Sequence, residues 1–447
     1  MRLDLRGAFA SLQTVEPIAE LGLVRRVAGG VVEASGPRVP VGTFCTLGST
    51  PGVPAEVIGF REDAILLMPL TGFAGLSPGM PVCGHHATLQ IPVGDALLGR
   101  VVDGLGRPID GRGPAAGPRR PVIAAAPGPL ERRRIHRPLA TGVRALDGLL
   151  TCGQGQRLGI MAGSGVGKSV LLGTIARHAA ADVNVISLVG ERGREVRDFL
   201  ERDLGDGLRR SVVVVATAEQ PPLVRIKAAL AALTLAEHFR ECGRHVLLIM
   251  DSLTRVVMAQ REIGLAAGEP PTTKGYPPSA FALLPQLLER VGTSPRGSIT
   301  GFFAVLAEAD DLNEPVSDAA RSVLDGHIAL SRRLAQRNHY PAIDVLASVS
   351  RVMPQVVEPS HLRAADEIRR LLAIHAEAEE VINLGAYVAG TNPELDDAIR
   401  RLPAIQRFLR QTPEEGSPLD ETRRKLEQLA RTPAPPAAPA TAGRRSE

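Results

Sequence analysis

The chain contains no tryptophan, and aromatic residues make up only 3% of its 447 residues. Proteins that bind single-stranded nucleic acid usually stack the bases on such side chains along a basic groove. The charge is also close to balance, since 52 lysines and arginines face 48 aspartates and glutamates and leave a net charge of +4. The composition therefore gives no support for a nucleic-acid partner and argues against a helicase.

Cysteine is scarce, and no two cysteines form a C-x-x-C pair. The four cysteines are widely separated, at Cys45, Cys83, Cys152 and Cys242. The ten histidines likewise form no H-E-x-x-H motif and no Cys/His cluster. The sequence thus disfavours a disulfide framework and a dedicated zinc site, and it suits a reduced cytosolic protein.

Long apolar runs are missing as well. No stretch of about 18 uncharged apolar residues is present that would span a bilayer. Residues 1–6 lack the apolar core of a signal peptide. We therefore expect a soluble cytoplasmic protein, which can still dock peripherally on a membrane complex.

The length of the chain predicts roughly three domains, and the residue pattern changes several times along it. Short β-rich runs between Gly and Pro turns predict a small closed β-barrel over residues 22–95. Alternating strand-like and helix-like runs over residues 96–357 are typical of an α/β domain with a mostly parallel sheet. Charged helical patterns predict an α-helical domain over residues 358–431. Residues 1–21 form a candidate partner-docking helix, and the Pro- and Ala-rich residues 432–447 are expected to be disordered.

Particular segments stand out as elements of these domains. The expected strands of the α/β domain include residues 183–189, 212–216, 245–250 and 299–307. Parallel sheets of this kind bind ligands at the carboxyl ends of their strands. The expected helices of the C-terminal domain are residues 362–384, 393–409 and 419–429.

A glycine-rich turn that ends in Lys-Ser joins an apolar strand-like run to a helix-like run. In such a turn, backbone N–H groups at the helix N-terminus cradle the phosphates of a nucleotide, the lysine supplies positive charge, and the serine hydroxyl faces Mg²⁺. The usual pattern G-x-x-x-x-G-K-[ST] is broken at one position, where Ala162 replaces the first glycine. The alternative is a glycine-rich turn that binds nothing. The predicted nucleotide-binding residues are Ala162, Gly163, Ser164, Gly165, Val166, Gly167, Lys168, Ser169 and Val170.

Hydrolysis of a nucleoside triphosphate needs a residue that orients water, a metal ion on the phosphates, and positive charge near the γ-phosphate. Glu191 follows an expected strand, and we predict that it orients the water; capping of the next helix is its alternative. Lys168 and Arg192 are predicted to contact the phosphates, unless Arg192 faces solvent. Asp251 ends another expected strand, and we predict that it joins Ser169 around Mg²⁺, with a helix N-cap as its alternative.

Several motifs in one order make the chain resemble the export ATPases of bacterial flagella and type III secretion systems. That family is similar to the catalytic subunits of rotary ATP synthases. The motifs that carry the resemblance are residues 98–108, 162–169, 190–195, 274–279 and 340–344. The resemblance implies a RecA-like P-loop core between an N-terminal β-barrel and a C-terminal α-helical domain. It also implies a homohexameric ring with ATP and Mg²⁺ between neighbours, and it makes Ala162 an accepted variant of the phosphate loop.

The resemblance implies two further site residues. Tyr340 matches the position that stacks on adenine, and Arg351 matches the arginine finger that a neighbouring subunit supplies. One polypeptide can then furnish every site of a ring. The alternatives are a tyrosine packed under a proline turn and an arginine that bridges local carboxylates. A finger supplied in trans raises turnover by about 10³ to 10⁵, so we expect an isolated monomer to be a poor enzyme.

We interpret the chain as an ATP hydrolase that powers or assists protein export. The residue sequence of the phosphate loop modestly favours the flagellar branch over the virulence branch. The implied partners are stator and central-stalk proteins, export cargo and chaperones, and a membrane export gate that the ring meets from the cytoplasm. Two alternatives remain open. One is a non-catalytic nucleotide-binding ring subunit, against which Glu191 speaks. The other is an RNA-translocating hexameric ATPase.

Overall fold

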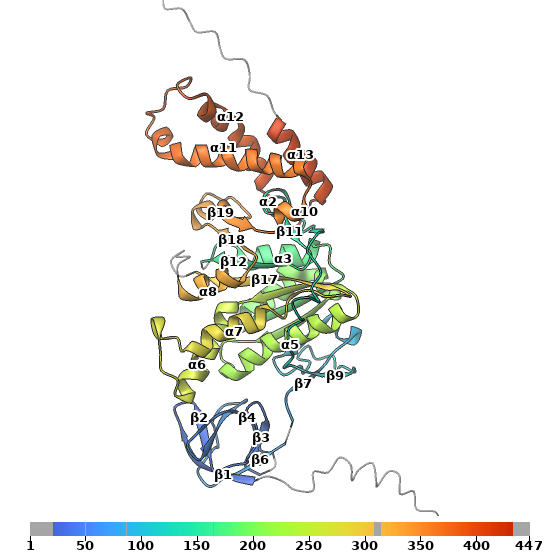
Figure 1. The fold of residues 1–447 in the computed structure, drawn as a ribbon, viewed down its shortest axis with the longest axis vertical. Coiled ribbons are helices and arrows are strands. Elements are labelled where there is room, and N and C mark those ends of the chain that lie inside the picture. Colours follow the sequence, from blue (N-terminus) through green and yellow to red (C-terminus); the bar gives the residue numbers. More distant parts are fainter. Residues whose placement is uncertain (1–20, 50, 86, 164, 308–313, 432–447) are drawn as a thin grey trace, which may run out of the picture.

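The computed structural model describes residues 21–49, 51–85, 87–163, 165–307 and 314–431. Three parts follow one another along the long axis of the molecule (Figure 1). A β-barrel lies at one end, a layered α/β domain in the middle, and a group of helices at the other end. The predicted fold class is confirmed. The candidate docking helix and the proline-rich tail lie outside the described residues.

The N-terminal part is a closed barrel of antiparallel strands in the order β1-β2-β5-β4-β3-β6. Alternate side chains point inward and form a small apolar core, which includes Val32, Leu47 and Leu67. The strands are β1 (Leu21–Ala28), β2 (Val31–Ala34), β3 (Phe44–Leu47), β4 (Val53–Arg61), β5 (Ala64–Pro69) and β6 (Pro81–Gly84). The next strand, β7 (Gln90–Pro92), pairs with β9 (Arg119–Pro121) outside the barrel.

The middle part contains a nine-stranded sheet in the order β19-β18-β12-β17-β15-β13-β14-β8, with β16 beside β17. All neighbours are parallel except the pairs β18–β19 and β16–β17. The strands are β8 (Arg100–Asp103), β12 (Arg157–Ala162), β13 (Val183–Val189), β14 (Ser211–Ala216), β15 (His245–Asp251), β16 (Gly292–Thr293), β17 (Ser298–Leu306), β18 (Gly326–Leu330) and β19 (Ile343–Ser350). The four expected strands are therefore confirmed to within a residue or two at their ends. Continuous apolar runs such as β13 and β14 are buried along their whole length, as strands covered on both faces must be.

Helices cover both faces of this sheet and create two separate apolar cores. Alternate residues of β14 face opposite sides, since Val212 and Val214 pack with α5 and α6 while Val213 packs with α3. The helices are α2 (Arg144–Leu149), α3 (Lys168–His178), α4 (Gly193–Asp198), α5 (Pro222–Glu241), α6 (Leu253–Ala267), α7 (Pro278–Leu288), α8 (Pro315–Val323), α9 (Arg332–Gln336) and α10 (Met353–Val356). Shorter elements are the helical turns η1 (Asp95–Leu97), η2 (Phe199–Leu204), η3 (Gly205–Arg210) and η4 (Thr273–Gly275), and the strand pair β10 (Pro138–Leu139) and β11 (Cys152–Gly153).

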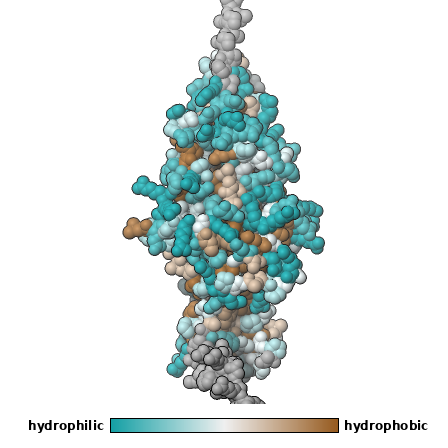
Figure 2. All heavy atoms as spheres, turned by 90° about the vertical axis from the view of Figure 1, so that its right-hand side faces the viewer, coloured by the Kyte–Doolittle hydropathy of each residue, from teal (hydrophilic) through white to brown (hydrophobic). Residues whose placement is uncertain are grey.

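Three helices form the C-terminal part, namely α11 (Pro359–Asn383), α12 (Pro393–Leu409) and α13 (Leu419–Arg431). They confirm the three expected helical runs. Their apolar sides join the core on the α3 side of the sheet through residues such as Ile368, Ala398 and Leu426. Within the described ranges, no helix has the length and apolar character needed to cross a bilayer. Polar side chains cover most of the face drawn in Figure 2, with hydrophobic residues in small groups between them.

Candidate nucleotide site

The phosphate loop connects the end of β12 to the start of α3. Gly165 and Gly167 have φ angles of +78° and +89°, a left-handed backbone that favours glycine. Ala162 is the last residue of β12 and lies buried in the sheet, so no glycine is required there. Lys168 opens α3, with Ser169 exposed beside it on the first helical turn. Ser164 lies outside the described residues.

Three predicted site residues meet at the carboxyl edge of the sheet. The Lys168 ammonium donates a hydrogen bond to the Asp251 carboxylate and lies 3.7 Å from Glu191 Oε1. Asp251 ends β15, and Glu191 follows the neighbouring strand β13 after one glycine, which brings the two carboxylates together. All three side chains are largely buried. The structure therefore surrounds one lysine of the phosphate loop with two carboxylates.

Neither carboxylate caps a helix, which was the alternative for each. Ser252 is the N-cap of α6, where its hydroxyl accepts from the backbone N–H of Arg255 at 3.3 Å. At the start of α4, Glu195 accepts from the backbone N–H of Arg192 at 3.3 Å. Asp251 and Glu191 are thus left facing Lys168.

The Glu191 carboxyl is poised to titrate near neutral pH. Burial raises its pKa to about 7, the negative charge of Asp251 adds to the rise, and Lys168 opposes it. A hydrogen bond from Glu191 lowers the pKa of the neighbouring Glu195 carboxyl. Below about pH 7, the Glu191 carboxyl therefore carries the proton of this pair, and the Glu195 carboxylate accepts it in a hydrogen bond.

Tyr340 lies on the other side of the phosphate loop. A Cβ atom on Gly167 would lie 3.4 Å from Tyr340 Cε1, so the ring lies close against the loop. The ring lines a mostly apolar cavity of about 380 Å³, together with Val170 on α3. The exposed fraction of Tyr340 is 41%, so it is not a tyrosine packed out of reach under its proline turn. A mostly apolar cavity beside a phosphate loop can hold a nucleotide base.

Arg351 lies at the opposite edge of the sheet. It follows β19, whose last residue Ser350 pairs with Gly326 at the start of β18. Because β18 runs parallel to β12, this is the edge where β12 begins. The phosphate loop begins where β12 ends, after a strand of six residues, which is about 17 Å away. The structure thus brings Lys168, Glu191, Asp251 and Tyr340 to one edge and Arg351 to the other.

Two family models match this chain. The nucleotide-binding domain of the ATP synthase alpha/beta family matches residues 142–350, and the T3SS EscN ATPase C-terminal domain matches residues 357–428. The flagellum-specific ATP synthase of Bacillus subtilis is 49% identical over 418 residues, covering 92% of this chain and 95% of that protein. The type 3 secretion system ATPase of Xanthomonas euvesicatoria is 52% identical over 406 residues, covering 90% of this chain and 92% of that protein.

This chain belongs to the family of flagellar and type III secretion ATPases. The family resemblance read from the motifs is therefore confirmed. Among solved structures, the assembled ATPase EscN from enteropathogenic E. coli has a TM-score of 0.88 and 46% sequence identity, covering 92% of this chain and all of that one. EscN has also been solved in complex with its central stalk EscO, with a TM-score of 0.85 and 45% identity.

Arg255 lies beside the site, and its place there was not predicted from the sequence. Arg255, on the first turn of α6, packs on Gly190, where a Cβ atom would lie 2.8 Å from Arg255 Cβ. Its Nε atom is buried and has no hydrogen-bond partner among the described residues. The only local sign of this position was its place four residues after Asp251, which an ordinary helix residue also satisfies.

The C-terminal domain of this ATPase also contributes to the cavity beside Tyr340, through Gln411, Thr412 and Pro413. The Gln411 backbone N–H donates to the Tyr340 carbonyl at 2.9 Å. No motif in the sequence marks this segment. Arg192 is exposed as the N-cap of α4, where its backbone N–H donates to the Glu195 carboxylate and its carbonyl accepts from the Val196 N–H at 3.1 Å. Its contact with the γ-phosphate stays a prediction.

Proposed function

We propose that this chain is an Mg²⁺-dependent ATP hydrolase that works as a homohexameric ring and powers or assists protein export through a flagellar or type III secretion apparatus. Family membership supports the ATPase activity, and relatives of both branches are about half identical to the chain. The solved EscN structures, one assembled and one with its central stalk, support the ring and a stalk partner.

One observation carries the proposal for a ring. Glu191 and Lys168 lie at one edge of the sheet, while Arg351 lies at the other, about a strand length away. A single protomer therefore cannot bring its own Arg351 to its own phosphate loop. Head-to-tail packing of protomers in a closed ring would place the arginine of one subunit on the nucleotide of the next.

The site residues take distinct roles in this proposal. The phosphate-loop amides and Lys168 bind the phosphates, Tyr340 stacks on adenine, and ionised Glu191 orients the attacking water. Asp251 and Ser169 offer a carboxylate and a hydroxyl, the oxygen ligands that Mg²⁺ prefers, at the start of α3. Bound Mg²⁺ would neutralise charge on the β- and γ-phosphates.

The family also suggests where the enzyme works. We propose that the ring docks peripherally at the cytoplasmic face of a membrane export gate. Stator and central-stalk proteins would hold it there, and export cargo with its chaperones would be delivered to it. Residues 1–21 are the proposed docking segment for a stator. Nucleic acid is not a proposed partner, which fits the net charge of +4.

Mixed rings test this proposal directly. We expect rings made only of Glu191→Gln subunits, and rings made only of Arg351→Ala subunits, to be nearly inactive. Rings mixed from the two should regain phosphate release, because some interfaces then combine an intact Glu191 with an intact Arg351. Proven mixed assembly without any recovery would count against Arg351 acting across the interface.

The two alternatives predict other results. A non-catalytic subunit would show the same phosphate release before and after the Glu191→Gln change. An RNA-translocating ATPase would be stimulated by RNA, and its RNA affinity would fall steeply with salt. We expect neither outcome.

A further inference from the structure

Asp325 is clamped to the first residue of β12. It lies between α8 and β18, at the same sheet edge as Arg351. Its carboxylate accepts from Arg157 Nε at 3.0 Å, from Arg157 Nη2 at 3.1 Å, and from the Arg157 backbone N–H at 3.0 Å. The Asp325 backbone N–H in turn donates to the Arg157 carbonyl at 2.9 Å. This arginine–carboxylate pair is bidentate, and it joins the start of β12 to the residue that precedes β18.

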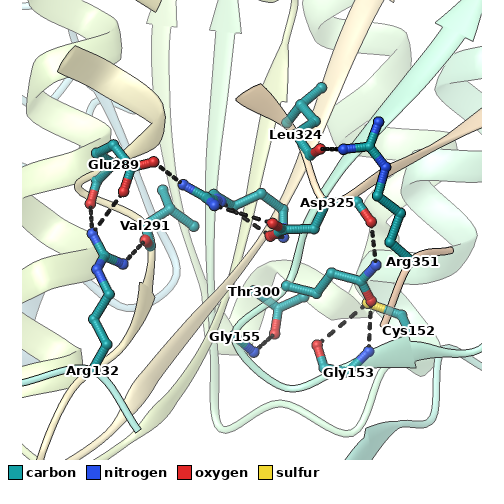
Figure 3. Close-up of polar contacts among 12 residues, drawn as sticks. Arg132, Cys152, Gly153, Gly155, Glu289, Val291, Thr300, Leu324, Asp325 and Arg351 are labelled. Carbon is teal, nitrogen blue, oxygen red and sulfur yellow. Dashed lines mark hydrogen bonds and ion pairs between the residues drawn. The ribbon is translucent and has the colours of Figure 1, made fainter. Parts of the chain in front are cut away.

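Arg351 depends on the segment that this clamp holds (Figure 3). The Arg351 backbone N–H donates to the Asp325 carbonyl at 3.1 Å, and Arg351 Nη1 donates to the Leu324 carbonyl at 3.3 Å. Among the described residues, this is the hydrogen bond recorded for the Arg351 guanidinium. The Asp325 carbonyl therefore holds the backbone of Arg351, and the Leu324 carbonyl beside it holds the guanidinium.

A second carboxylate, Glu289, also binds Arg157, but it supports the Asp325–Arg157 clamp only weakly. Arg157 Nη1 lies 2.5 Å from Glu289 Oε1, and Arg132 Nη2 lies 3.1 Å from Glu289 Oε2 (Figure 3). Glu289 is 45% exposed, compared with 26% for Asp325. Since solvent screens exposed pairs more strongly, Asp325 is the main partner of Arg157.

We propose that Asp325 is a positioning residue for Arg351. By binding Arg157 it holds the Leu324 and Asp325 carbonyls, and these direct the guanidinium toward the nucleotide of the neighbouring protomer. This inference rests on the proposed function, in which Arg351 acts in trans. A catalytic group displaced by about 1 Å can cost about 100-fold in rate, even when the displaced group is itself intact.

Single substitutions give the first test. We expect Asp325→Ala to lower kcat for ATP by about 10- to 100-fold, while KM for ATP changes by less than about twofold because the nucleotide pocket lies at the other edge. Asp325→Asn keeps one acceptor for the Arg157 backbone and should lower kcat less. This milder variant carries the same tests if the alanine variant does not assemble.

A matched control exists at the far end of the sheet. Asp110 binds Arg100 on β8 with the same bidentate geometry, at 2.6 Å and 2.9 Å, and the pair is likewise largely buried. Asp110→Ala removes an equivalent arginine partner away from Arg351. We expect it to keep the kcat of the unchanged ring, whatever stability it loses. An equal loss of kcat in both variants would overturn the proposal.

Mixed rings distinguish a finger defect from general damage. If Asp325 acts through Arg351, mixing Asp325→Ala with Glu191→Gln subunits should restore activity, whereas mixing Asp325→Ala with Arg351→Ala subunits should not. If Asp325 instead supports its own protomer's phosphate loop through β12, the two mixtures should behave in the opposite way. The opposite pattern, or no recovery in the first mixture, would overturn the inference.

The same series separates this inference from the proposed function. Failure of the Glu191→Gln and Arg351→Ala mixture to recover would count against the trans role of Arg351 itself. Recovery in that mixture without recovery in the mixture of Asp325→Ala with Glu191→Gln would reject only the role of Asp325. Each result is read as phosphate release per assembled ring.

Discussion

The Lys168 ammonium donates a hydrogen bond to the Asp251 carboxylate, although the two residues come from different strand–helix units. The proposed function assigns these groups to different ligands, the lysine to phosphate and the carboxylate to Mg²⁺. Binding of Mg-ATP would therefore separate the pair, and each member would exchange the other for an ion of opposite charge.

This exchange predicts the effect of Asp251→Asn. An amide loses the charge that attracts Mg²⁺ but can still accept a hydrogen bond from Lys168, so the fold should be kept. We expect the gain in ATP affinity that Mg²⁺ normally brings to fall by about 10- to 100-fold, a loss typical of damaged metal sites. Titration of a fluorescent ATP analogue with and without a chelator measures it.

The control for this prediction is Asp206→Asn, since Asp206 is 91% exposed in η3 and its ion pair with Arg209 lies on the surface. It should leave the affinity gain unchanged. If Asp251→Asn kept the full gain from Mg²⁺, Asp251 would not be a metal ligand.

The raised pKa of Glu191 predicts a pH dependence of stability. The folded-state pKa of about 7 exceeds the ordinary glutamate pKa of 4.5, so between these values the folded chain holds a proton that the unfolded chain has lost. The stabilisation from this proton is fully present below about pH 4.5 and is lost as the pH rises to about 7, at up to about 1 kcal/mol per pH unit. Glu191→Gln should therefore be the more stable protein above pH 7.

Denaturation of the two proteins at a series of pH values checks this prediction. All other titrating groups are shared, so the difference in stability between wild type and Glu191→Gln isolates the one carboxyl group. The difference should grow between pH 4.5 and 7 and then stay constant. A difference that does not vary with pH would mean that the Glu191 carboxyl titrates normally.

The sequence contained enough information for the fold class and for much of this site, because both rest on local patterns. Short apolar runs mark β13 and β15 in the sequence, and a glycine-rich run marks the phosphate loop. The carboxyl ends of parallel strands lie at one edge of a sheet. That rule alone brings Glu191 and Asp251 together. Strand β8 was not expected, because it is a four-residue edge strand that joins β14 from a distant part of the sequence.

The contacts that sequence reasoning missed are all non-local. Gln411 reaches Tyr340 across 71 positions (411 minus 340), and Asp325 reaches Arg157 across 168. Aspartates and glutamines that follow a helix, as Asp325 and Gln411 do, are usually surface residues. Their type and spacing therefore carry no information about such pairs. Only the register of β12, β18 and β19 brings Asp325 and Arg351 to one place.

Stacking on adenine predicts how Tyr340 variants behave. Tyr340→Phe keeps the ring beside Gly167, whereas Tyr340→Ala removes it from the cavity. Base–aromatic stacking is worth about 1 to 3 kcal/mol, so we expect the alanine variant to bind ATP about 5- to 150-fold more weakly. The phenylalanine variant should bind normally, and equal losses in both would mean that the hydroxyl, not the ring, makes the contact.

A buried ion pair joins the barrel to the α/β domain. Lys227 Nζ on α5 lies 2.7 Å from Glu56 Oε1 on β4, and their side chains are only 4% and 6% exposed. Burial raises the pKa of the Glu56 carboxyl, and Lys227 opposes the rise. Glu56→Ala would leave the Lys227 charge buried without a partner, which costs about 3 to 5 kcal/mol in such pairs. A large drop in the denaturation midpoint should follow.

Replacing both partners by apolar residues avoids the buried charge, so Glu56→Leu combined with Lys227→Met should recover most of the lost stability. Glu201→Ala is the matched control, because it removes one partner of the exposed pair Arg197–Glu201 and should change the midpoint little. If Glu56→Ala cost no more than Glu201→Ala, water would have to reach Lys227 in solution, and the barrel would not be held against α5 by this pair. A double variant weaker than Glu56→Ala would instead show that the charges themselves hold the two parts together.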